Sequence, residues 1–110
     1  MTWPKKNTRT ITADGQQFLW HLSGNRLDGK ETVITVGKNG QKYLLFIDPY
    51  PWDFDITPSN ISKAVSWALG QGWAPASGPT KNMAYSKRRK TFVWLPKGIR
   101  YIHELKTPKR

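Results

Sequence analysis

Four consecutive basic residues, Lys87-Arg88-Arg89-Lys90, stand immediately before an aromatic stretch that contains Phe92 and Trp94. Lysine and arginine neutralise the phosphates of nucleic acid, and aromatic rings stack on unpaired bases. We therefore predict that this run binds a polyanion, together with Lys97 and Arg100. Two structural alternatives remain open. The run can be a solvated loop, and Phe92 and Trp94, which share one face of a strand, would be core residues if that face packs on a helix.

A second pattern whose residue types could bind a ligand is the acidic and aromatic run Asp48-Pro49-Tyr50-Pro51-Trp52-Asp53-Phe54-Asp55. Three carboxylates within eight residues can hold a hard cation such as Mg²⁺ or Ca²⁺. However, the run lacks the glycine and the closing glutamate of an EF-hand loop. We favour a proline-stiffened connection whose aspartates accept backbone N–H groups and precede a helix. Tyr50, Trp52 and Phe54 cannot all point inward, so they form a candidate partner-binding loop.

Residues suited to catalysis are sparse in this chain. His21 and His103 are the only histidines, and neither belongs to a Ser–His–Asp, nucleophile-elbow or phosphate-loop motif. The chain contains no cysteine, which excludes a thiol nucleophile, a zinc knuckle and an iron–sulfur site. We therefore predict a non-catalytic protein without a metal or cofactor, in which His21 is a surface or hydrogen-bonded residue.

The charge of the whole chain favours a polyanionic or acidic partner. The 110 residues carry 18 Lys and Arg against 7 Asp and Glu, a formal net charge of +11. Residues 61–110 contain eleven of these bases and a single acid, Glu104, so the excess is concentrated in the C-terminal half. Solubility is the simplest alternative explanation, but it typically requires a net charge of only about 2–8.

Turn signals and periodicity predict the elements that position these residues. Five β-prone stretches predict strands, at residues 9–13, 16–22, 31–36, 41–47 and 90–95. Asp14-Gly15 and Asn39-Gly40 predict tight turns, because both dipeptides tolerate positive φ. The segment 74–86 is rich in Pro, Gly, Ser and Thr, so we expect a loop there, with a short ordered stub at residues 84–85.

The strongest local signal is that of a helix after residue 56. Thr57 and Pro58 have the residue types of an N-cap and a first helical position. Apolar residues then recur with helical spacing at Ile61, Ala64, Val65, Ala68 and Leu69. Trp67 flanks this stripe, where it either edges the core or is partly exposed. Gly72 is expected as a left-handed C-cap, with Trp73 folding back on the last turn.

One stretch resembles a known group of proteins. Ile56-Thr57-Pro58, a helix closing on Ala68-Leu69, and Gly72-Trp73-x-Pro75 resemble small uncharacterised bacterial proteins of mobile elements, in integron-cassette or toxin–immunity neighbourhoods. The resemblance covers residues 44–75 and carries no catalytic residues. It implies a non-enzymatic accessory or interaction protein. The basicity of this chain argues against a DNA-mimicking inhibitor, because nuclease-inhibiting immunity proteins tend to be acidic.

These patterns predict a single α+β domain over residues 1–110, with a flexible tail at about 105–110. We expect an antiparallel sheet of about five strands in the order ββββαβ, with the helix packed on one face. The predicted core consists of Phe18, Trp20, Ile34, Leu44, Phe46, Ile61, Val65, Ala68, Leu69, Phe92 and Trp94. The second face would show Leu19, Leu45, Ile47, Val93 and Leu95. Because that face would be uncovered and apolar, we expect a homodimer.

The predicted function is that of a small binding module whose basic C-terminal half contacts nucleic acid or another polyanion without sequence specificity. The alternative is a protein-interaction or immunity-like module that uses the second sheet face or residues 50–54. The longest apolar run, residues 44–47, falls far short of the ~20 residues of a membrane-spanning helix. The first ten residues lack the apolar stretch of a secretory signal. We therefore expect a cytoplasmic, bacterial protein without membrane contact.

Overall fold

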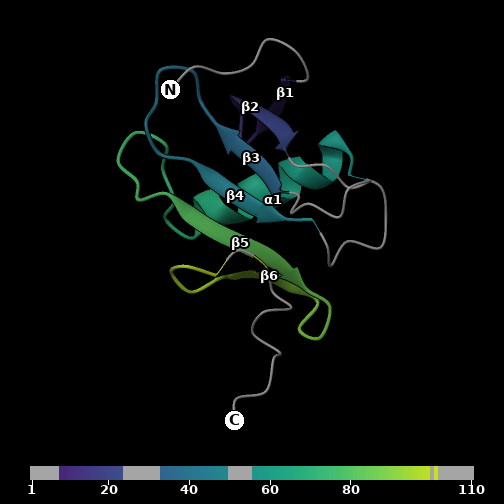
Figure 1. Ribbon diagram of the computed structural model, residues 1–110. Helices are drawn as coiled ribbons and strands as arrows, with labels where there is room; N and C mark the ends of the chain where they lie inside the picture. The colour runs from purple at the N-terminus through teal and green to yellow at the C-terminus, as the bar shows by residue number, and fades with distance from the viewer. Residues whose placement is uncertain (1–7, 24–32, 50–55, 100, 102–110) are drawn as a thin grey trace.

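Six strands and one helix form the part of the chain that this computed structural model describes, namely residues 8–23, 33–49, 56–99 and 101 (Figure 1). The elements follow one another as β1 (Arg9–Ala13), β2 (Gln16–Ser23), β3 (Val33–Gly37), β4 (Leu45–Asp48), α1 (Pro58–Gly70), β5 (Lys81–Ser86) and β6 (Thr91–Trp94). All six strands belong to one sheet, in which they lie side by side in chain order. The fold is therefore α+β, as the sequence predicted.

The sheet differs from the prediction in its strand number and in one pairing. The pairs β1–β2, β2–β3, β3–β4 and β5–β6 are antiparallel, whereas β4 and β5 are parallel. Parallel neighbours need a long crossover connection, and α1 lies within the one that joins these two strands. The additional strand is β5, which occupies the end of the segment 74–86 that was predicted as a loop. The sheet thus has six strands where about five were predicted, and it is antiparallel, as predicted, except at the β4–β5 pair.

β4 begins four residues later than predicted. Strand character was predicted from residue 41, but the ladder with β3 begins only at Leu45. The backbone N–H of Tyr43 donates instead to the carbonyl of Pro75, at 3.1 Å, and that of Leu44 donates to Thr80 Oγ1, also at 3.1 Å. Pro75 and Thr80, in the segment that leads into β5, therefore accept the backbone N–H groups of two residues that were expected to pair within a strand.

The Asp14-Gly15 turn and the two ends of α1 follow the sequence closely, whereas at Asn39-Gly40 only the glycine has a positive φ. Asp14 and Gly15 both have positive φ, 53° and 76°, as a type I′ hairpin turn requires. Thr57 caps α1, because its Oγ1 accepts the backbone N–H of Asn60 at 3.3 Å. At the other end the N–H groups of Gly72 and Trp73 donate to the carbonyls of Leu69 and Ala68. This is the Schellman arrangement.

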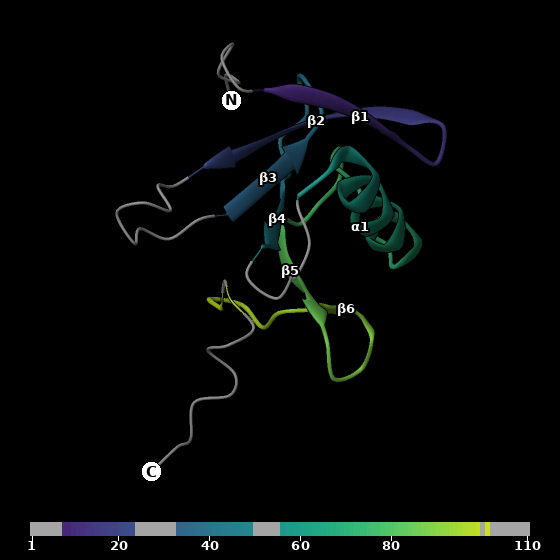
Figure 2. The same ribbon diagram turned by 90° about the vertical axis from the view of Figure 1, so that its right-hand side faces the viewer.

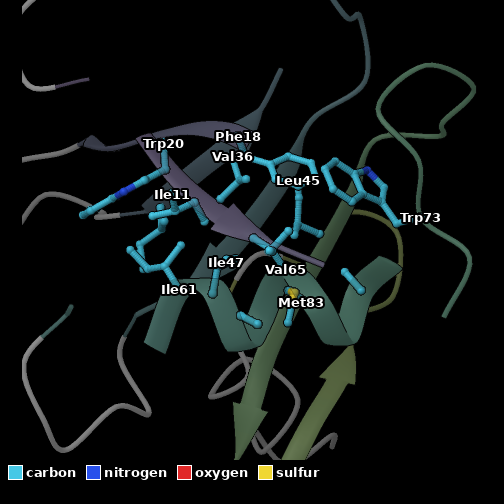
Figure 3. Close-up of a cluster of buried hydrophobic side chains, with 14 residues drawn as sticks. Ile11, Phe18, Trp20, Val36, Leu45, Ile47, Ile61, Val65, Trp73 and Met83 are labelled. Atoms are coloured by element: carbon cyan, nitrogen blue, oxygen red, sulfur yellow. The ribbon is translucent and has the colours of Figure 1, made fainter. Parts of the chain in front are cut away.

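A single cluster of buried apolar side chains joins α1 to one side of the sheet (Figures 2 and 3). The members of this cluster are Ile11, Ala13, Phe18, Trp20, Ile34, Val36, Leu45, Ile47, Ile61, Ala64, Val65, Ala68, Trp73 and Met83. Two serines of α1 add hydrogen bonds to β1 and its turn. Ser62 Oγ donates to the Thr12 carbonyl and Ser66 Oγ to Asp14 Oδ1, each at 2.6 Å. The helix is thereby held across the β1 edge of the sheet.

The two faces of β4 are the reverse of the prediction. Ile34 pairs with Ile47 and Val36 with Leu45, so Leu45 and Ile47 lie on the core face and are completely buried. Phe46 lies on the second face, half-buried, and Leu44 is also only partly buried. Because the run from 44 to 47 is entirely apolar, its alternation carries no information about which face is inside.

The second face is accordingly less apolar than predicted. Leu45 and Ile47 are absent from it, and Leu95 is buried. Its strand positions include Thr35 and Asp48, both of which are buried. Half-buried apolar side chains remain on this face at Leu19, Phe46 and Val93.

Candidate functional site

The basic run forms the complete tip of the β5–β6 hairpin. The ladder between these strands closes with the pair Ser86 and Thr91, so residues 87–90 constitute the whole connecting loop. All four side chains are exposed. Figure 2 shows this loop on the far side of the sheet from β1. The structure therefore presents four consecutive cationic side chains at the end of a hairpin.

Local hydrogen bonds hold the backbone of the tip in a defined turn. The N–H of Lys90 donates to the Ser86 carbonyl at 2.7 Å, and the N–H of Arg89 donates to Ser86 Oγ at 3.2 Å. Lys90 has a φ of 59°, a conformation in which a residue with a Cβ is strained. These hydrogen bonds fix the backbone of the turn that carries the four exposed side chains.

The described residues place little compensating negative charge around the tip. Within the described ranges the acidic side chains are Asp14 and Asp48. Asp14 lies in the β1–β2 turn at the opposite edge of the sheet, and Asp48 is completely buried. No exposed carboxylate of the described residues therefore lies beside residues 87–90.

Phe92 and Trp94 lie on the α1 side of the sheet but are only half-buried. They contact Trp67 of α1, with ring centroids 5.9 Å from Phe92 and 4.8 Å from Trp94. Tyr85 of β5 meets Phe92 edge-on at 5.4 Å. We call these four residues the aromatic cluster. Its rings pack at the margin of the core, so neither the core nor the exposed alternative describes Phe92 and Trp94 fully.

Lys81 is the residue that sequence reasoning missed at this surface. Its Nζ lies 4.5 Å from the centroid of the Trp94 ring, in cation–π contact. Lys81 opens β5, inside the segment predicted as a loop, so nothing in the local sequence connected it to Trp94. The register brings them together: Met83 pairs with Trp94, and Lys81 precedes Met83 by two residues on the same face of β5.

The other predicted binding residues are not gathered at the tip. Lys97 is exposed beyond the end of β6, at the opposite end of the hairpin from residues 87–90. Arg100 lies outside the described residues, as do Tyr50, Trp52 and Phe54 of the predicted partner-binding loop. The predicted tail at about 105–110 also lies outside them.

Metal binding finds no assembled site in the described residues. Their His, Cys, Asp and Glu side chains form no group of three or more that could hold a metal ion. His21 lies on the second face, where burial lowers the pKa of its imidazole below 6.5 and a hydrogen bond with the Leu22 backbone opposes that shift. α1, the helix of the described segments, does not have the length and apolarity that crossing a membrane requires.

Comparison with protein-family models, with curated proteins and with solved structures finds no match to this chain.

Proposed function

We propose that this protein is a non-catalytic binding module that holds nucleic acid or another polyanion through the hairpin tip, residues 87–90. The observation that carries the proposal is the assembly of four exposed cations into one ordered turn. The formal net charge of +11 supplies a long-range attraction to any polyanion. The cytoplasmic location predicted from the sequence remains part of this proposal.

The contacts expected from this geometry are with phosphates. Lysine and arginine side chains on a short turn reach the phosphates of a nucleic acid, and phosphate contacts carry no sequence information. We therefore expect affinity with little dependence on base sequence. Affinity should fall linearly with salt on a log–log plot, because each neutralised phosphate releases condensed counterions.

Fluorescence anisotropy with labelled duplex DNA over ~50–300 mM salt tests the proposal, since counterion effects are large in this range. If all four residues of the tip touch phosphates, the slope of log K against log salt is about −3.6, from ~0.9 for each contact. Changing Lys87, Arg88, Arg89 and Lys90 together to Ser should remove most of this slope. The pair Arg88→Ser and Arg89→Ser should halve it, to about −1.8.

A charge-matched control is available at the other end of the sheet. Lys38 and Lys42 lie in the β3–β4 connection. Because β4 and β5 are parallel, this connection lies at the end of the sheet where β5 begins, whereas the tip lies at the end where β5 stops. The double variant Lys38→Ser, Lys42→Ser loses the same two charges and should leave the slope unchanged. An equal change in both double variants would show that the net charge acts and the tip does not.

No binding tighter than ~100 μM at the low-salt end, the weak limit of ordinary non-specific binding, would overturn the proposal. In that case the protein-interaction or immunity-like alternative takes its place, with a partner at residues 50–54 or on the second sheet face. Docking of that kind rests on apolar burial and has little salt dependence.

A further inference from the structure

We infer that the polyanion is a single-stranded nucleic acid whose bases stack on the aromatic cluster beside the hairpin tip. This inference rests on the proposed function and specifies its ligand. Proteins that hold single strands combine cations along the backbone with aromatic rings that receive the bases. The hairpin and α1 bring both kinds of residue to one edge of the sheet.

The position of the rings at an edge makes them accessible. β6 is the last strand of the sheet, and among the described elements it has a neighbour only on the β5 side. Trp67, Tyr85, Phe92 and Trp94 are each partly exposed, although aromatic side chains of a core would be enclosed. Each ring lies with its centroid 4.8–5.9 Å from that of a neighbour and is tilted against it, so the four side chains form one contiguous cluster with several separate ring faces.

Lys81 marks the ring face that a base can occupy. Its ammonium group lies 4.5 Å from the centroid of Trp94, and a strongly hydrated cation takes such a place where water has access. Stacking of a base on an indole is a stronger interaction than a cation–π contact at an exposed site. A base can therefore displace the ammonium group from the ring, and the long side chain of Lys81 can then turn to the adjacent phosphate.

Cations occur on both units that carry the aromatic cluster, namely the β5–β6 hairpin with its tip, and α1. The hairpin tip lies beyond one end of β5 and Lys81 lies at the other, separated by roughly 17 Å for the five residue steps from Lys81 to Ser86. Lys63 is exposed one turn before Trp67 on α1, and residues four apart lie side by side on a helix surface. This charge pattern complements a phosphate backbone that runs along β6 with its bases turned toward the rings.

A duplex does not satisfy this arrangement. Its bases are stacked and paired within the helix, so it offers phosphates to the tip but no base faces to Trp94. The inference therefore predicts a difference between ligands of equal phosphate content. Tip contacts are shared by duplex and single strand, whereas ring contacts belong to the single strand alone.

Anisotropy at one fixed salt concentration with the unaltered protein provides the first test. The probes are a labelled oligo-dT, an abasic oligomer of the same length, and a duplex with the same length in base pairs. We expect the abasic oligomer to bind at least ~5-fold more weakly than oligo-dT, since base–aromatic stacking contributes about this factor or more for each base. Equal affinity for the two single strands would overturn the inference. This comparison requires no altered protein.

Two variants then locate the stacking surface. Trp94→Leu keeps an apolar side chain against Trp67 but removes the indole, and it should weaken oligo-dT binding at least ~5-fold while sparing the duplex. Phe46→Leu is the matched control, because Phe46 is a half-buried ring on the opposite face of the sheet. Equal losses in both variants, or none in Trp94→Leu, would contradict the assignment.

Failure of the inference can be told apart from failure of the proposed function. If the duplex, oligo-dT and the abasic oligomer bind equally, and the four-Ser variant of the tip binds them more weakly, the polyanion function stands and the stacking does not. Binding of none of the three probes would remove both. If Trp94→Leu does not melt cooperatively, the abasic comparison, which uses the unaltered protein, decides the question.

Discussion

Gly78→Ala tests how the segment between α1 and β5 is seated, and its cost follows from two separate observations. Gly78 has a φ of +66°, which disfavours any residue with a Cβ by ~1–2 kcal/mol. A Cβ at this position would also overlap the Cγ, Cδ1 and Cε1 atoms of the Tyr43 ring. Overpacking of this kind costs ~1–3 kcal/mol, so we expect a loss of about 2–5 kcal/mol in the free energy of unfolding.

Thermal melts followed by circular dichroism measure this loss. The entropy of unfolding scales with chain length, and for 110 residues each kcal/mol corresponds to about 4 °C in Tm. Gly78→Ala should therefore lower Tm by about 9–22 °C. Gly98→Ala is the control, because Gly98 has a φ of +87° but nothing within 4 Å of an added Cβ. That variant should lose only the backbone component, about 4–9 °C.

A double-mutant cycle isolates the contact with the ring. In a Tyr43→Ala background, Gly78→Ala should cost only as much as Gly98→Ala, because the overlapping atoms are gone. Equal Tm losses for the two glycine variants in the native background, or an unchanged cost of Gly78→Ala after removal of the ring, would refute this account of the Tyr43 contact.

Four further predictions concern the core, the tip, the second face and the assembly. Val65→Asp buries a carboxylate in the apolar cluster and should unfold the protein or lower its stability by more than ~4 kcal/mol, whereas Lys63→Asp, on the exposed side of α1, should melt near the unaltered protein. A cooperative melt of Val65→Asp within about 2 °C of the unaltered protein would contradict this. Lys90→Gly should raise Tm by about 4 °C, since glycine adopts positive φ without strain, and a lowered Tm would refute it. Burial lowers the pKa of His21, so below pH 6.5 the unfolded chain takes up the proton first; urea titrations should show stability falling as the pH drops from 6.5 to the folded-state pKa, and the fall should be smaller in His21→Gln. The homodimer remains a prediction that now rests on Leu19, Phe46 and Val93, and a 12.6 kDa particle in light scattering at micromolar protein would contradict it.

Features that depend on neighbouring residues could be predicted from the sequence. The cap at Thr57, the Schellman end at Gly72 and the turn at Asp14-Gly15 are each decided within four or five residues, by side-chain hydrogen bonds and by φ preference. The basic tip belongs to the same class, since its four members are consecutive in the chain. The α+β class followed because hydrophobic periodicity distinguishes a long amphipathic helix from strands.

Other features were decided by partners distant in sequence. Residues 81–86 become a strand because β4 and β6 supply hydrogen bonds on both sides, although their own composition favours a loop. The pairing of Leu45 with Val36 chose the buried face of a run whose alternation carries no signal.

The candidate site divides in the same way. The sequence by itself determined that residues 87–90 are charged and exposed, because consecutive basic side chains lie at the surface wherever the fold allows. Only the tertiary structure decided that Trp67 of the crossover helix meets Phe92 and Trp94, and that Lys81 lies over Trp94. The physical reason is that the apolar stripe in the sequence shows which side of α1 is buried but not which strands that side covers. The parallel crossover between β4 and β5, in which α1 lies, decides which strands the helix covers.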